Sequence, residues 1–110
     1  MPVPVLDIAA ARITDWKSFH DVFAESLGFP DDYGRNLDAW IDCMTYLDAG
    51  DGATDTVVPR GEILTLRVIG GRAFRNHAPE QYDGLIESAA FVNWRRLEAG
   101  DDAIIALAFS

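Results

Sequence analysis

Two carboxylates are the sharpest chemical feature of the sequence. Asp38 and Asp42 are four residues apart, so they share one face of any helix that spans them, and Thr45 continues that face. Neighbouring carboxylates repel each other unless a cation meets them, although a place in the first helical turn offsets part of that cost for Asp38. The pattern is typical of a solvated acidic face, and it also suits a surface that binds a basic partner.

A catalytic or metal-binding role fits these carboxylates less well. Two carboxylates about 5–6 Å apart could act as general acid and base, as in glycosidases. That chemistry needs a deep sugar-binding cleft, which a 110-residue α/β layer rarely supplies. Neither His20 nor His77 has a ligand spacing to the pair, so we expect no metal site and no cofactor. An enzyme would need a strongly perturbed carboxyl pKa inside a cleft, and we therefore expect a chain that is not an enzyme.

Other reactive or aromatic residues have structural interpretations. Nearby carboxylates would raise the pKa of the Cys43 thiol, which argues against a nucleophile and favours a small buried side chain. A single cysteine forms no intrachain disulfide and suits a reducing compartment. We expect core positions for Trp40 and Trp94, surface or helix-end positions for His20 and His77, and solvent-directed side chains for Arg95 and Arg96.

The negative charge is concentrated in one stretch of the chain. The sequence has 18 acidic and nine basic residues, for a net charge of −9, and residues 31–55 alone carry −6. Phosphate contacts need lysine and arginine, so nucleic acid and anionic membrane are poor partners. The sequence also lacks an apolar run of about 18 residues, which a membrane-spanning helix would need. The expected partner is a basic protein.

The elements that position these residues alternate between strands and helices. Apolar patterns predict strands at 3–8, 62–69 and 103–109, and helices over 15–27, from 36, over 73–77 and from 79. Thr14 or Asp15 is the expected N-cap of the first helix, Gly28 its end, and Asn36 the N-cap of the second. This order predicts an α/β fold, a small three-stranded parallel sheet with about four helices packed on it.

Three details of this arrangement are also predicted. With three strands, one face of the sheet can remain uncovered. The nearly all-apolar closing strand is expected to be covered on both faces or internal. Residues 48–61 are mostly turn formers and are expected to form a long exposed loop that touches a strand at Val57-Val58.

The segment from Ser18 to Cys43 closely resembles the barstar family. Its core is the run Pro-x-x-Tyr-Gly-x-Asn-Leu-Asp-Ala-x-x-Asp-Cys, which extends here from Pro30 to Cys43. The preceding amphipathic helix and the apolar C-terminal strand also fit, so we expect residues 1–110 to form a single barstar-like domain, diverged between about 48 and 79. The resemblance implies a cytoplasmic inhibitor of a barnase-like ribonuclease.

In that family the acidic second helix and the loop before it plug the basic active site of the nuclease. On this model Asp42 mimics a substrate phosphate and meets the catalytic arginines and histidine of the enzyme, while Asp38 adds a second charged contact. The partner-binding residues that the resemblance implies are Asp32, Tyr33, Gly34, Asn36, Asp38, Ile41, Asp42 and Thr45.

The sequence departs from the family pattern at three contact positions. Asp32 stands in place of a tyrosine and Ile41 in place of a tryptophan, while a later glutamate contact falls near Arg95 or Arg96. The last change reverses a charge. These departures keep a second hypothesis open, in which the chain is a barstar-fold module for a different basic protein that is not a ribonuclease.

Overall fold

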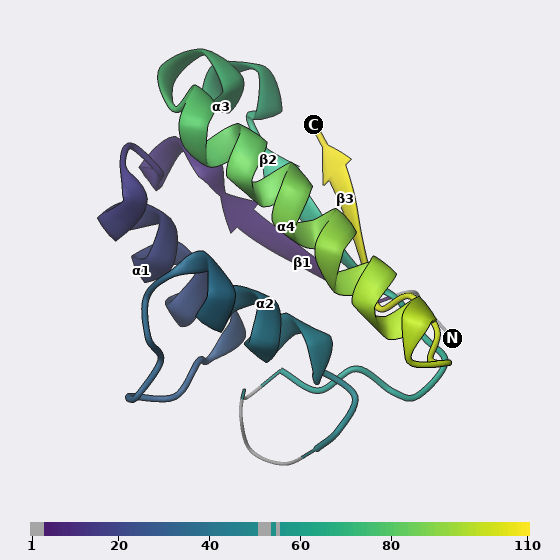
Figure 1. Cartoon of the computed structure of the whole chain (residues 1–110). Coiled ribbons are helices and arrows are strands. Elements are labelled where there is room, and N and C mark those ends of the chain that lie inside the picture. The colour runs from purple at the N-terminus through teal and green to yellow at the C-terminus, as the bar shows by residue number, and fades with distance from the viewer. Residues whose placement is uncertain (1–3, 51–53, 55) are drawn as a thin grey trace.

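The fold is a three-stranded parallel sheet with helices packed on it (Figure 1). The computed structural model describes residues 4–50, 54 and 56–110, so residue 3 of the first predicted strand and residues 51–53 and 55 of the predicted loop lie outside the described residues. The strands are β1 (Val5–Ala9), β2 (Leu64–Ile69) and β3 (Ile105–Phe109), in the order β1-β2-β3. The helices are η1 (Ala10–Arg12, a 3₁₀ turn), α1 (Trp16–Leu27), α2 (Leu37–Thr45), α3 (Gly71–His77) and α4 (Pro79–Glu98). The predicted α/β class is confirmed.

One face of the sheet is bare. Consecutive strands are neighbours, and right-handed crossovers that step in one direction place all their helices on the same face. On the other face Val5 and Ile69 are exposed, and Arg67 pairs with Asp7 at 2.7 Å across β1 and β2. The uncovered face expected of so small a sheet is thus confirmed.

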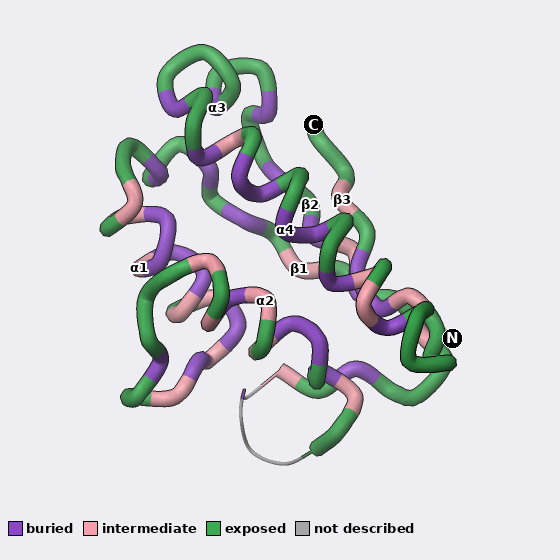
Figure 2. The backbone as a smooth tube through the Cα atoms, in the orientation of Figure 1, coloured by how far each residue is buried: buried purple, intermediate pink, exposed green. Residues whose placement is uncertain are grey.

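The core lies between the helices and the covered face of the sheet (Figure 2). Ile8 and Leu66 contribute from the sheet, Phe19 and Phe23 from α1, and Trp40 from α2, all fully buried. Helix α2 packs against α4, so it forms the outer part of the helical layer. This position leaves one side of α2 in solvent.

Local sequence signals fix both ends of α1 and the start of α2 as predicted. Asp15 caps α1 by accepting a hydrogen bond from the Ser18 amide at 2.8 Å, and the Ser18 hydroxyl bonds back to the Asp15 amide. Gly28 ends α1 in the left-handed conformation, with φ of 70°. Asn36 caps α2 by accepting from the Ala39 amide at 2.8 Å.

The structure corrects two expectations about burial and one about strand pairing. β3 is an edge strand with Ala106 and Ala108 exposed, because the bare face of the sheet leaves their side uncovered. Trp94 is 56% exposed and lies outside the core, because the buried stripe of α4 runs through Leu85, Val92 and Arg96 instead. The amide of Val58 donates to the carbonyl of Leu47 at 2.9 Å, and among the described residues Val57 and Val58 are in no strand pairing.

The two histidines differ. His77 is exposed at the end of α3, as predicted, and its Nε2 lies 2.8 Å from the carbonyl oxygen of Ile13. His20 is buried in α1, which corrects the expected surface position. Within the described residues no helix is long and apolar enough to cross a membrane.

Candidate protein-binding surface

The outer side of α2 presents the two carboxylates singled out in the sequence. Trp40 and Met44 anchor the opposite side of the helix in the core and are fully buried. Asp38 and Asp42 are exposed, and Ile41 beside them is half-buried. Because the buried side fixes the rotation of the helix, the carboxylates cannot turn inward without breaking the core.

The loop before α2 carries further acidic side chains and is tied to α1. Asp31 and Asp32 are exposed in this loop; with Asp38 and Asp42 they are named here the acidic surface. Arg35 has φ of 54°, an uncommon conformation for a residue with a side chain, and its guanidinium donates to the Lys17 carbonyl at 3.2 Å and to Asp21. These bonds hold the loop against α1.

Arg35 secures the loop through Asp21, whereas Gly34 lets the loop pass close to α2. Hydrogen bonds from Lys17 and Arg35 lower the pKa of Asp21, which keeps the anchoring carboxylate charged. Gly34 lies exposed against the start of α2, and a Cβ at this position would stand 3.3 Å from the Cβ of Ala39. The turn is therefore close to the helix that follows it.

Tyr33 is buried, whereas the family resemblance implies a contact residue at this position. Its hydroxyl lies 2.5 Å from Nδ1 of His20, and its ring packs on Phe29. Burial raises the pKa of the Tyr33 hydroxyl. Burial, followed by the charge of Arg35, lowers the pKa of His20. Tyr33 thus supports the loop from inside and exposes little of its surface.

Thr45 is likewise withdrawn from the surface. It is buried at the end of α2, and its hydroxyl donates to the carbonyl of Ile41 at 2.6 Å. The helical spacing places it in line with Asp38 and Asp42, but α4 covers this end of α2. Of the eight predicted contact residues, Tyr33 and Thr45 are the two that burial removes from the surface.

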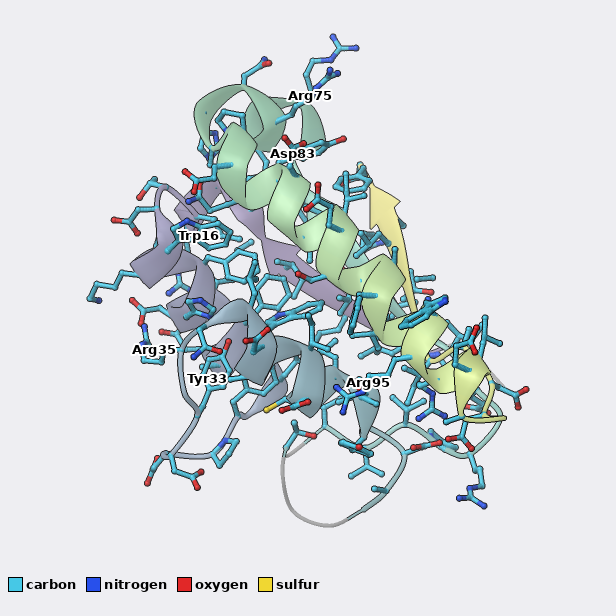
Figure 3. All side chains as sticks on the ribbon, viewed as in Figure 1. Trp16, Tyr33, Arg35, Arg75, Asp83 and Arg95 are labelled. Carbon is cyan, nitrogen blue, oxygen red and sulfur yellow. The ribbon has the colours of Figure 1, made fainter. Side chains whose placement is uncertain are left out.

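Arg95 adds a cation to the acidic surface. It extends from α4 toward α2 (Figure 3), and its Nη1 donates to Oδ1 of Asp42 at 2.7 Å. The side chains are 38% and 63% exposed, respectively. The guanidinium also lies over the ring of Tyr46, with Cζ 5.9 Å from the centroid. The hydrogen bond with Asp42 raises the pKa of Arg95.

A different arginine secures the far end of α2. Arg96 is buried, which corrects its expected solvent position, and it forms an ion pair with Asp48 at 2.8 Å. It also donates to the carbonyls of Thr45 at 2.7 Å and Asp102 at 2.6 Å. The pair holds the C-terminal end of α2 on α4, and the hydrogen bond from Arg96 lowers the pKa of Asp48.

A family model described as Barstar (barnase inhibitor) matches residues 3–104 of the chain. The chain belongs to the barstar family. No curated protein matches it. Membership of a family of barnase inhibitors implies an inhibitor-type function.

The three departures from the barstar-family pattern have definite places in this structure. Asp32 is exposed in the loop and Ile41 is half-buried on α2. Of the two candidates for the third position, Arg95 is bonded to Asp42 and Arg96 is buried with Asp48. Arg95 was predicted as a solvent-directed side chain and as a candidate for the changed contact, and its contact with Asp42 was not foreseen. Tyr46 was missed, and the signal that could have found it is an aromatic residue placed directly after an acidic helix.

The chemistry available to this barstar-family surface is electrostatic. Cys43 is half-buried on α2 beside the carboxylates. Across residues 4–50, 54 and 56–110, three or more histidine, cysteine or acidic side chains nowhere gather as a metal site would require. The exposed groups offer charge and hydrogen-bond acceptors to a partner.

Proposed function

We propose that this chain inhibits a barnase-like ribonuclease by covering its basic active site with the acidic surface. The observation that carries the proposal is the pair Asp38 and Asp42, held in solvent on a helix whose other side is locked into the core of a barstar-family fold. The proposed contacts are Asp32, Gly34, Asn36, Asp38, Ile41 and Asp42. No nucleic acid, membrane or cofactor takes part.

The proposed mechanism is steric and electrostatic blockade. A ribonuclease active site binds phosphate with cations, and a carboxylate at the same place accepts the same hydrogen bonds. Arg95 occupies Oδ1 of Asp42 with one bond, so Oδ2 is the natural acceptor for an enzyme cation. Asp38, one helical turn away, supplies a second acceptor. Substrate is then excluded because the helix fills the cleft.

Long-range attraction assists this blockade. The net charge of the chain is −9, so a basic enzyme is drawn toward it before contact. The rate of association should therefore fall as salt increases, while dissociation changes much less. A cytoplasmic setting is proposed with the inhibitor function, and the single cysteine is compatible with its reducing chemistry.

The test is a titration of purified protein into a barnase-like ribonuclease. We expect stoichiometric inhibition at low salt that weakens at moderate salt and is lost in Asp42→Ala. Asp83→Ala is the matched control, because Asp83 is an exposed carboxylate on α4, away from α2 (Figure 3). Equal effects of the two substitutions would show that Asp42 is not central to binding.

The second candidate function is a module that binds another basic protein. It is favoured by the same three positions, since Asp32 and Ile41 replace aromatic contacts and Arg95 partly neutralises Asp42. Under this alternative the folded protein leaves a barnase-like ribonuclease fully active. A basic protein is then retained on the immobilised chain and released by Asp42→Ala.

A further inference from the structure

The ion pair between Asp42 and Arg95 changes what the acidic surface can bind. Asp42 is the carboxylate with a cation attached, whereas Asp38 has no ion pair among the described residues. Both partners remain partly open to solvent, so the pair is weak and an arriving cation can share or displace it. Until a cation of the partner displaces Arg95, the net charge of the pair of Asp42 and Arg95 is nevertheless close to zero.

Arg95 itself imposes a second condition on a partner. A guanidinium has five N–H donors, and Asp42 takes one of them at Oδ1. The ring of Tyr46 lies against the guanidinium and offers a π face and one hydroxyl. A partner that covers Arg95 without acceptors of its own therefore leaves buried donors unsatisfied, which weakens binding.

Arg95 also repels some partners. A site that offers cations alone meets a like charge within hydrogen-bond distance of Asp42. A site that offers a cation to Asp42 and a carboxylate to Arg95 satisfies both residues. The alternating order of charges on this surface thus distinguishes two kinds of basic site.

We propose that Arg95 is a specificity-determining residue, which selects a basic enzyme that carries a carboxylate next to the cation bound by Asp42. This inference rests on the proposed function and names the chemistry of the preferred partner. Enzyme sites that bear only cations are bound less tightly because Arg95 stands beside Asp42.

The test compares single substitutions for their dissociation constant with a barnase-like ribonuclease whose cleft is lined mainly by cations. We expect Arg95→Gln to tighten binding by about tenfold or more. Arg95→Lys keeps the charge and should stay within about threefold of the unmodified chain. The matched control is Arg67→Gln, which removes one positive charge from an exposed ion pair on the bare face of the sheet.

The control separates local from long-range charge effects. Because Arg67→Gln also makes the chain more acidic by one charge, it should tighten binding by less than about twofold. Equal gains from Arg95→Gln and Arg67→Gln would overturn the inference, as would no gain or a loss from Arg95→Gln. Circular dichroism and thermal unfolding are used to check that each variant is folded.

The same experiment distinguishes failure of the inference from failure of the proposed function. If the unmodified chain inhibits and Asp42→Ala does not, the function stands whatever Arg95→Gln does. If only Arg95→Gln inhibits, inhibition by the unmodified chain fails for this enzyme, while the selective role of Arg95 against a cation-lined cleft is supported. If no variant binds the enzyme, the proposed function fails, and the inference that rests on it is overturned as well.

Discussion

Asp48 and Arg96 form an ion pair that is almost enclosed by the protein. Nη2 of Arg96 lies 2.8 Å from Oδ2 of Asp48, and their side chains are 13% exposed for Asp48 and 8% for Arg96. A second bond joins Nη1 of Arg96 to Oδ1 of Asp48 at 3.2 Å. The residues are 48 positions apart in the sequence, so the pair joins the segment after α2 to the last turn of α4.

This geometry predicts that Asp48→Ala destabilises the fold by about 3 kcal/mol, because it leaves the Arg96 cation buried without its counter-ion. Urea denaturation followed by circular dichroism measures the change. Asp42→Ala is the comparison, since it removes one partner of an exposed ion pair and should cost less than about 1 kcal/mol. Similar losses of stability in the two variants would contradict the structural role of Asp48.

Asp42→Ala should instead act on binding. We expect it to reduce the affinity for a barnase-like ribonuclease by about 2 kcal/mol or more, because a desolvated enzyme cation then loses its acceptor. Isothermal titration calorimetry at about 150 mM salt measures the loss, with Asp83→Ala alongside. An unchanged dissociation constant for Asp42→Ala would remove it from the proposed contact surface.

The N-cap of α2 contributes to the stability of the fold. Asn36 accepts a hydrogen bond from the Ala39 amide, so Asn36→Ala should destabilise the fold by about 1 kcal/mol. Asn36→Asp retains an acceptor and should preserve the helix. Thermal unfolding of both variants tests this expectation. The cap explanation would be wrong if the alanine and aspartate variants unfolded at the same temperature.

Buried His20 predicts a dependence of stability on pH. Its pKa is lowered in the folded state from 6.5, mainly by burial, so the unfolded chain binds a proton at a pH where the folded chain does not. The free energy of unfolding should therefore fall as pH decreases below about 6.5 and should level off only below the folded pKa.

Chemical denaturation of the unmodified chain and of His20→Asn across about pH 5 to 7 measures this effect. The unmodified chain should lose more stability over that range than the variant. Parallel profiles would show that His20 does not account for the dependence. Because His20 touches Tyr33, the loss should be accompanied by loosening of the loop before α2, measurable by amide hydrogen exchange.

The sequence alone was enough to predict the fold class and the elements around the surface. Asp15, Gly28 and Asn36 mark helix ends through bonds and conformations that span only a few residues, so they act whatever the rest of the chain does. The apolar spacing of α1 and the alternation of buried and more exposed residues along β2 have the same local character. The family pattern identified the acidic helix because it is one continuous run of sequence, from Pro30 to Cys43.

Tertiary structure decided which side chains of that helix and loop are exposed. Tyr33 is buried against His20, and Arg95 meets Asp42 across 53 residues of sequence. Arg95 and Arg96 are adjacent, yet one reaches the acidic surface and the other is buried with Asp48. Successive residues on a helix point about 100° apart, so their surroundings depend on how α4 packs against α2. That packing angle arises from contacts among distant residues, and no local pattern of α4 encodes it.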